Sequence, residues 1–232
     1  MVERTELVFI YVSCIIDLIS IAHIRQTLTV SSSFSAGTVD LVGIDTEEEG
    51  IINQTSSLTG VPREPDGVVF MRDNYFVTAD EGDMDGGSRG FTVWDVCGNN
   101  VYGSGNFLDR YTASIGHYPE ERSGNKGAEP ENAAFGTFMG TDYLFVNAER
   151  ANVVFVYDAS DPSKPKFKQA LPTNVGPEGG LALPSRNLYI VANEVDNRDD
   201  GFRAGVTIYE YTKSMPQYPT LESVIDKTVR LY

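Results

Sequence analysis

Short apolar runs, separated by turns rich in Gly, Pro, Asn and Asp, recur along the chain and predict β-strands. One arrangement occurs three times and opens with Pro beside an acidic residue, at 64–67, 129–132 and 176–179. A small apolar strand follows at 68–71, 133–138 and 180–183. An aromatic or β-branched strand comes next, at 75–80, 143–149 and 188–194. Further strands follow at 91–95, 154–158 and 206–210, with a weaker fourth strand at 166–171.

This repeat predicts an all-β protein, specifically a β-propeller built of four-stranded blades. The interval from Asp66 to Glu131 is 65 residues, and that from Glu131 to Glu178 is 47. Groups of short strands at a period of about 40–50 residues are typical of propeller blades. A loop inserted at 116–131 explains the longer first interval. We therefore predict blades near residues 64–110, 129–172 and 177–232.

The number of repeats predicts an incomplete ring. Propellers typically have at least four blades, and the residues before 58, with a predicted strand at 38–44, supply one more partial blade at best. We therefore expect residues 31–232 to form a partial propeller, in a chain that is a fragment, a truncated gene product or half of an assembly. The remaining blades would then be missing from this chain.

The most apolar run of the chain, residues 7–24, precedes this domain. A signal peptide has a basic start and an uninterrupted apolar centre, whereas Glu3, Arg4 and Glu6 precede this run and Asp17 interrupts it. As a membrane span, the run would place Asp17 near mid-bilayer at a cost of roughly 2.5–3.5 kcal/mol. The alternatives for residues 1–30 are a degenerate signal or anchor, a buried segment, or sequence foreign to the domain.

The charge of the chain restricts the classes of ligand and partner that it could bind. Its 232 residues carry a net charge of −15, with a pI near 4.4. This balance excludes a nucleic-acid partner, which needs a basic face, and it fits a secreted protein or a binder of divalent cations. The two cysteines (Cys14, Cys97) and two histidines (His23, His117) lack the spacing of a zinc or iron–sulfur site. Any metal should be a hard cation such as calcium, held by carboxylates and carbonyl groups.

The inserted loop at 116–131 concentrates both signs of charge. It contains four glutamates and two cations: Glu120, Glu121, Glu129, Glu131, Arg122 and Lys126. The glutamates are candidate metal ligands, and the two cations are candidates to hold a bound phosphate or carboxylate. The alternative is a solvated loop whose charges pair with one another, which contributes little to stability when exposed.

Two further sets of acids recur in step with the strands. Those that open the three blades are Asp66, Glu131 and Glu178. The first strand of a propeller blade lines the central channel, so these carboxylates should meet in one axial region, where like charges need a cation among them. The alternative is that each acid caps a turn of its own blade. The acids that close the second strand of each blade are Asp80, Glu149 and Glu194.

Residues 81–86 form a candidate calcium loop. Glu81, Asp83 and Asp85 stand at positions 1, 3 and 5, and a glycine stands at position 6. The twelfth position is Thr92 rather than Glu, so the loop is not an EF-hand. A plain flexible turn is the alternative to metal binding here.

Several segments, in one order, resemble a known family. They read VTADEGD (77–83), GHYPEERSGNKGAEPE (116–131), AERANVVFVYD (148–158), DPSKPKF (161–167), LPTNVGPEG (171–179) and IVANEV (190–195). The pattern is similar to the choice-of-anchor I domain of mesenchyme-specific cell-surface glycoproteins and of some bacterial proteins described as alkaline phosphatases. The resemblance implies a secreted or surface-anchored propeller, and the association of animal members with biomineral implies calcium handling. Family members are usually longer, with further blades, and residues before Ser31 match nothing in the pattern.

Three functions follow as hypotheses. The first is a secreted or cell-surface propeller module that binds calcium or another hard divalent cation and has a structural, extracellular-matrix or biomineral-associated role. The second is a metal-dependent, alkaline-phosphatase-like phosphomonoesterase, in which the loop glutamates bind metal and the two loop cations hold a phosphorylated small molecule. The third is a peptide- or protein-binding propeller without metal. No pairing of a nucleophile with a base in the sequence identifies a catalytic residue.

Overall fold

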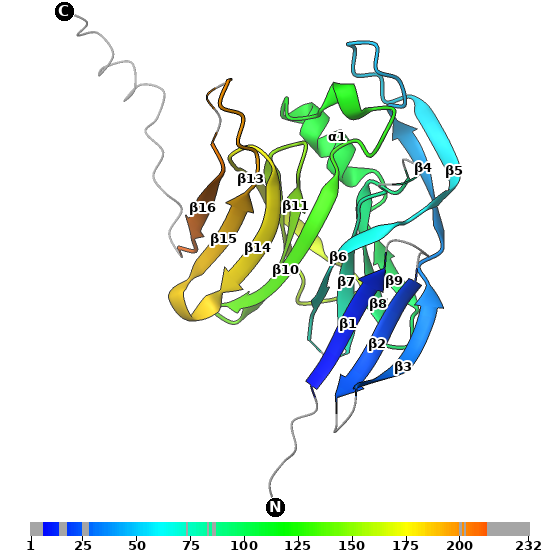
Figure 1. Ribbon diagram of the computed structural model, residues 1–232, viewed down its shortest axis with the longest axis vertical. Helices are drawn as coiled ribbons and strands as arrows, with labels where there is room; N and C mark the ends of the chain where they lie inside the picture. Colours follow the sequence, from blue (N-terminus) through cyan, green and yellow to red (C-terminus); the bar gives the residue numbers. More distant parts are fainter. Residues whose placement is uncertain are drawn as a thin grey trace, which may run out of the picture.

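The computed structural model describes residues 7–13, 18–24, 28–72, 74–82, 84, 87–199, 201 and 203–212. These residues form a series of antiparallel β-sheets with little helix, which confirms the predicted all-β class (Figure 1). Within the described residues, no helix has the length and apolar character needed to cross a membrane.

Three sheets correspond to the three sequence repeats. The first contains β6 (Pro65–Phe70), β7 (Tyr75–Asp80), β8 (Gly90–Asp95) and β9 (Asn100–Gly103). The second contains β10 (Pro130–Phe138), β11 (Thr141–Ala148), β12 (Val153–Asp158) and β13 (Lys166–Pro172). The third contains β14 (Pro177–Leu183), β15 (Leu188–Asn193) and β16 (Gly205–Glu210), with the short 3-10 helix η2 (Pro184–Arg186) between its first two strands.

Each of these sheets has the topology of a propeller blade. Its strands pair in chain order, so every sheet is an antiparallel meander. The first strands β6, β10 and β14 lie next to one another, with the other strands leading outward (Figure 1). A Cβ atom added to Gly67 of β6 would come within 2.7 Å of the backbone oxygen of Glu131 in β10, so these inner strands approach closely. The predicted four-stranded blades are thus confirmed for the first two repeats.

Apolar side chains fill the spaces between the blades. The first two sheets enclose a core that includes Val77, Val93 and Phe155. The second and third sheets enclose another, in which the rings of Phe145 and Tyr189 stack with centroids 4.0 Å apart. Alternate residues of the middle sheet face opposite neighbours, as the two-residue period of a strand requires. Packing between sheets therefore fixes how the inner strands meet.

Residues before the first blade also form strands. β1 (Leu7–Ser13), β2 (Leu18–Ile24) and β3 (Leu28–Ser35) make a three-stranded sheet whose first strand lies beside β6 (Figure 1). The predicted domain boundary at residue 31 falls inside β3. The predicted strand at 38–44 is β4 (Thr38–Ile44), which pairs with β5 (Ser56–Pro62) in a separate hairpin.

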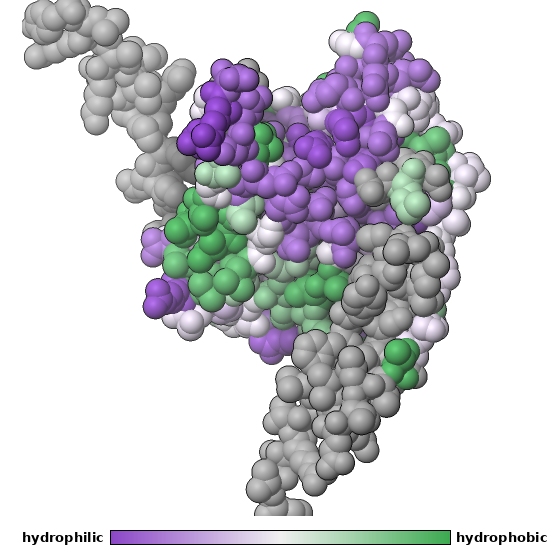
Figure 2. Space-filling model, in the orientation of Figure 1, coloured by the Kyte–Doolittle hydropathy of each residue, from purple (hydrophilic) through white to green (hydrophobic). Residues whose placement is uncertain are grey.

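The connection between the first and second blades carries most of the helix in the described chain. It contains α1 (Phe107–Ser114) and the 3-10 helix η1 (Glu120–Arg122), and it ends at β10. Figure 2 shows hydrophilic residues gathered on the part of this face that holds α1 and the neighbouring loops, whereas a hydrophobic patch lies over β14 and β15. The predicted inserted loop therefore lies on the polar end of the blades.

Candidate functional site

An identical irregularity opens each blade. Immediately after Pro65, Pro130 and Pro177, the pairing between the first and second strands shifts register. The acids Asp66, Glu131 and Glu178 lie in these shifted positions. A β-bulge bends a strand and redirects the side chain that it carries, so one local device turns the same acid of each blade toward the neighbouring blades.

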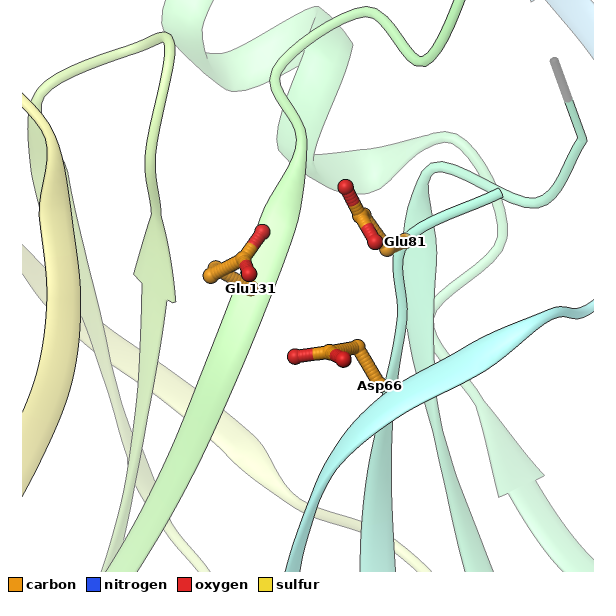
Figure 3. A group of neighbouring side chains, drawn as sticks. All are labelled: Asp66, Glu81 and Glu131. Atoms are coloured by element: carbon orange, nitrogen blue, oxygen red, sulfur yellow. The ribbon is translucent and has the colours of Figure 1, made fainter. Parts of the chain in front are cut away.

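These acids belong to a continuous group of carboxylates drawn from all three blades. Oxygen atoms within 4.8 Å of one another define three overlapping sets: Asp66, Glu81 and Glu131; Glu129, Glu131 and Glu149; and Glu149, Glu178 and Glu194. We call these seven residues the carboxylate cluster. In the first set, the side chains project from separate segments into one shared space (Figure 3). Carboxylate oxygens at this spacing are the ligands that hard divalent cations prefer.

The strand register corrects one sequence interpretation. Pro65 pairs with Asp80, whereas Pro130 and Pro177 pair with Ala148 and Asn193. The residues that follow these partners, Glu81, Glu149 and Glu194, therefore occupy equivalent positions in the three blades. In the first blade, the counterpart of Glu149 and Glu194 is Glu81, not Asp80.

Asp80 itself lies outside the carboxylate cluster. Its buried carboxylate accepts hydrogen bonds from the hydroxyl groups of Thr78 (2.6 Å) and Thr92. Because neighbouring residues of a strand face opposite sides of the sheet, a misalignment by one residue selected the wrong side chain. The structure therefore gives Asp80 a role within its own blade.

Glu129 is the common hydrogen-bond partner of three basic side chains at the site. Its carboxylate accepts hydrogen bonds from Arg122 Nη2 at 3.0 Å, Lys126 Nζ at 3.3 Å and Arg150 Nε at 3.3 Å. Lys126 also donates to Glu81 Oε1 at 2.8 Å. Arg122 and Lys126, predicted to hold a phosphate, thus lie against carboxylates of the cluster.

Arg150 was missed by the sequence analysis. Its guanidinium Nη1 lies 2.8 Å from Glu149 Oε1, besides the contact with Glu129. The only sequence signal was its position next to an acid that closes a second strand. This cation neutralises charge at the junction of the second and third sets of carboxylates.

Burial and like charge suppress the ionisation of two cluster carboxyls. Burial, together with the charges of Glu81 and Asp66, raises the pKa of Glu131 to about 9. Burial and a hydrogen bond with Glu129 raise the pKa of Glu149 to about 8. One oxygen of Glu131, Oε2, is buried without a hydrogen-bond partner among the described residues. The cluster therefore carries more carboxylate than its cations compensate.

The pKa values of Glu129 and Glu178 shift in opposite directions. Burial opposes ionisation of Glu129, but the hydrogen bond with Glu149 and the three surrounding cations outweigh it and lower the pKa. Burial and the neighbouring charge of Glu194 raise the pKa of Glu178. The cluster thus contains an ionised, cation-paired centre and a flank of acids that repel one another.

A buried ion pair between Arg89 and Asp109 anchors the backbone of the inserted loop. The guanidinium of Arg89 donates to the backbone oxygens of Asp45 (2.7 Å) and Ser123 (2.6 Å), and its Nη1 lies 3.2 Å from Asp109 Oδ2. Asp109, in α1, accepts a hydrogen bond from the backbone N–H of Ala128 at 2.9 Å. This pair was not predictable from the sequence, because neither residue stands in a motif. Its effect is to fix the backbone that leads into Glu129.

Several charged residues of the site have left-handed backbone. The φ angles are +45° at Glu64, +65° at Arg89, +70° at Lys126 and +58° at Glu129. Each costs of order 1 kcal/mol for a residue with a side chain. Four such residues around one site indicate that the surrounding structure determines their positions.

The remaining predicted ligands lie elsewhere. Glu120 accepts a hydrogen bond from the backbone N–H of Gly50 at 2.6 Å, and Glu121 is exposed; both are outside the cluster. Asp83 and Asp85 lie outside the described residues. Of the predicted calcium loop at 81–86, the structure therefore assigns only Glu81 to the cluster.

Together, these features define an all-β protein of propeller blades with an acidic site where the inner strands of three blades begin. The family model of the choice-of-anchor I domain matches residues 84–162, which confirms the resemblance found in the sequence. The matched region includes the whole inserted loop, with Glu129 and Glu131, and also Glu149. The name of the family suggests a protein of the cell surface or one that is secreted. Comparison with curated proteins finds no match.

Two solved structures resemble the chain. One is a functionally unknown protein from Desulfotomaculum acetoxidans DSM 771, with 11% identity and a TM-score of 0.41. The other is a protein from Lactobacillus plantarum, with 14% identity and a TM-score of 0.39. The alignments cover 87% and 86% of this chain but only 66% and 64% of those chains, so it spans less than two thirds of their length. A likeness of this degree says nothing about function.

Proposed function

We propose that this protein is a secreted or cell-surface propeller module that binds calcium, or another hard divalent cation, through the carboxylate cluster. The observation that carries the proposal is the convergence of carboxylates from three blades on shared positions, with oxygens within 4.8 Å of one another. The seven acids face three cations, so the site has an excess of negative charge that a divalent ion would neutralise.

The geometry supports a cation in preference to an anion. Within the described residues, Arg122 and Lys126 contact Glu129, so their charge is already compensated. Among the residues that the structure describes, Oε2 of Glu131 is buried and has no hydrogen-bond partner, and the charges of Glu81 and Asp66 act on this carboxyl. Such an atom would gain a partner from a bound metal ion. Calcium suits the site because it accepts irregular sets of six to eight oxygen ligands.

Calorimetric titration of chelator-treated protein with calcium tests this proposal. We expect saturable binding and a rise in melting temperature, because a ligand that binds only the folded state stabilises it. Glu131→Gln should weaken binding by at least about tenfold, since it removes a carboxylate shared by two of the three sets. Glu121→Gln is the matched control, because Glu121 lies in the same loop but outside the cluster.

Two results would refute calcium binding at this site. One is the absence of both a heat signal and a thermal shift with calcium. The other is equal binding by Glu131→Gln and the control, which would place the ion elsewhere. Repeating the titration with magnesium and manganese, followed by elemental analysis of the purified protein, identifies the preferred ion.

Phosphomonoester hydrolysis is the second candidate, and we rank it lower. It requires Arg122 and Lys126 to turn from Glu129 toward a phosphate. Incubation with a chromogenic phosphomonoester at alkaline pH, with and without chelator, tests it. Chelator-sensitive hydrolysis that is lost in Arg122→Ala would reverse this ranking.

A further inference from the structure

One short sequence motif lies outside the carboxylate cluster and the inserted loop. Asn53, Gln54 and Thr55 form an Asn-X-Thr triplet, the acceptor sequence for N-linked glycans. No other asparagine of the chain stands in such a triplet. The triplet lies in the connection between β4 and β5, which projects beyond the sheets at the top of the view in Figure 1. Since triplets of this kind also arise by chance, the local structure has to show whether the asparagine can be reached.

The side chains of the triplet are accessible. Asn53 and Thr55 are both exposed, with the half-buried Gln54 between them. The hydroxyl group of Thr55 donates a hydrogen bond to Oδ1 of Asn53 at 3.0 Å. This contact uses the oxygen of the amide and leaves Nδ2, the atom to which an N-linked sugar is attached. Among the described residues, no group accepts a hydrogen bond from Nδ2 of Asn53.

The backbone of Asn53, in contrast, is fixed. Its N–H donates to Oδ2 of Asp45 at 2.6 Å, and its carbonyl oxygen accepts from the N–H of Thr55 at 2.8 Å. Asp45 is buried, and its own backbone oxygen accepts a hydrogen bond from the buried Arg89. The fold therefore holds Asn53 through main-chain groups. Replacing or modifying the side-chain nitrogen should leave the β4–β5 hairpin intact.

Apolar side chains next to the triplet are exposed to solvent. Ile51 and Ile52, which precede Asn53, are 67% and 44% exposed, and Val42 of β4 is 72% exposed. An N-linked glycan is bulky and solubilising, so one attached at Asn53 would cover part of this apolar surface. None of the seven acids of the carboxylate cluster lies in the β4–β5 connection. A glycan there would leave the ligands of the proposed cation unmodified.

We propose that Asn53 is an acceptor site for an N-linked glycan, with a lipid-diphosphate-linked oligosaccharide as the donor. In the transfer, Nδ2 of Asn53 forms a bond to the anomeric carbon of the first sugar. The bond from that carbon to the diphosphate oxygen breaks, and the lipid diphosphate leaves with the electron pair. The proton lost from Nδ2 passes to a base of the transferase. Modification requires entry into the secretory pathway, and in this respect it rests on the proposed function.

Expression of the full chain in a eukaryotic secretory host, behind a cleavable leader, tests the acceptor site. The leader brings the chain to the glycosylating compartment whatever its native route. We expect the intact mass to exceed that of the polypeptide by a single N-linked glycan. An amidase that removes such glycans should abolish the excess and leave aspartate at position 53.

Four variants assign the glycan to the triplet. Asn53→Gln and Thr55→Ala should lack it, because one removes the acceptor amide and the other the hydroxyl group that the motif requires. Thr55→Ser keeps the hydroxyl group and should carry the glycan. The matched control is Asn100→Gln, which replaces an exposed asparagine outside any such triplet and should also carry it.

A chain recovered from this host with Asn53 unmodified would overturn the proposal. A mass excess that persists in Asn53→Gln or in Thr55→Ala would overturn it as well, because the sugar would then be attached without regard to the triplet. Calcium titration of the wild-type chain and Asn53→Gln separates this result from the proposed function. Absence of calcium binding in both would refute the cation site alone, whereas an unmodified Asn53 would leave the cation site in place.

Discussion

Glu129 is the residue on which the charge balance of the site depends. It accepts hydrogen bonds from Arg122, Lys126 and Arg150, and its own side chain is 1% exposed. We expect Glu129→Gln to lower the free energy of unfolding by about 2–3 kcal/mol. This is below the roughly 3–5 kcal/mol for fully buried pairs, because the two arginines are partly exposed. Urea denaturation, compared with the control Glu121→Gln, measures the loss.

An unchanged stability of Glu129→Gln would contradict this account of the three ion pairs. The amide of Gln keeps the shape of Glu but removes the negative charge, so the three cations would lose their common partner. Chelator in the buffer keeps any bound ion from masking the effect.

The elevated pKa values of Glu131 and Glu149 predict how the metal-free protein responds to pH. The pKa values in the folded state are about 9 and about 8, above the ordinary 4.5. Between about pH 5 and 9, the folded protein therefore binds more protons than the unfolded chain. Its free energy of unfolding should fall as the pH rises, by at most about 1.4 kcal/mol per pH unit for each carboxyl.

Thermal melting in chelator at pH 6, 7, 8 and 9 checks this dependence. The melting temperature should decrease across the series, and the decrease should be smaller in Glu131→Gln, which has no carboxyl to deprotonate. A melting temperature that is constant or rises with pH, or an identical slope in both proteins, would show that these carboxyls are not held in the protonated form.

At the residue scale, the sequence named every acid of the cluster as a candidate ligand but did not identify the residues that surround the cluster. Six of these acids stood out through recurrence or charge density, and Glu81 stood out through the candidate calcium loop. Arg150 and the buried pair of Arg89 and Asp109 did not, because their partners, apart from Glu149 beside Arg150, are distant in sequence. Arg89, for example, reaches backbone oxygens 44 and 34 residues away. Such contacts depend on tertiary packing, and a single sequence carries no periodic signal for them.

At the scale of elements, a register error of one residue changed a site assignment. The second strands of the blades have the sequences YFVTADE, YLFVNAE and LYIVANE, which align without a gap. In the first blade this strand ends in two acids, and matching the first of them, Asp80, to Glu149 shifted the alignment of that blade by one position. The pairing of Pro65 with Asp80 restores Glu81 as the counterpart. Because side chains alternate between the two faces of a sheet, a shift of one residue replaces each side chain by one that faces the opposite side.

Gly127 is required by the close approach of the inserted loop to α1. Its φ is +56°, and an added Cβ would lie 2.5 Å from Asp109 Oδ2. Gly116, at the start of the loop, also has a positive φ (+74°) but open space around it. Gly116→Ala should therefore cost only the backbone term of roughly 1–2 kcal/mol, and Gly127→Ala about 2 kcal/mol more.

Equilibrium unfolding of the two alanine variants separates backbone strain from the contact with Asp109. Gly127→Ala should also weaken calcium binding, because the loop continues directly into Glu129. Equal stability of the two variants would mean that the carboxylate of Asp109 moves aside without cost.

For the whole molecule, periodicity was enough to predict the all-β class and the blades. Each blade is a local meander, so its strands follow one another in sequence and their turn residues mark the boundaries. The role of residues 7–24 was not predictable in the same way. A run of apolar residues does not distinguish a strand from a signal or an anchor, and only its place beside β6 shows that it forms strands of a sheet.

The carboxylate cluster joins three blades that also share apolar cores, so cation binding should act on all of them together. Asp66 and Glu81 come from the first blade, Glu131 and Glu149 from the second, and Glu178 from the third. Without a cation, repulsion among these carboxylates opposes the close approach of the inner strands. Calcium should therefore slow hydrogen exchange at the three blade openings, 64–67, 129–132 and 176–179, with one common midpoint. Glu131→Gln should abolish the response at all three, whereas binding confined to one blade would slow exchange at a single opening and contradict a shared site.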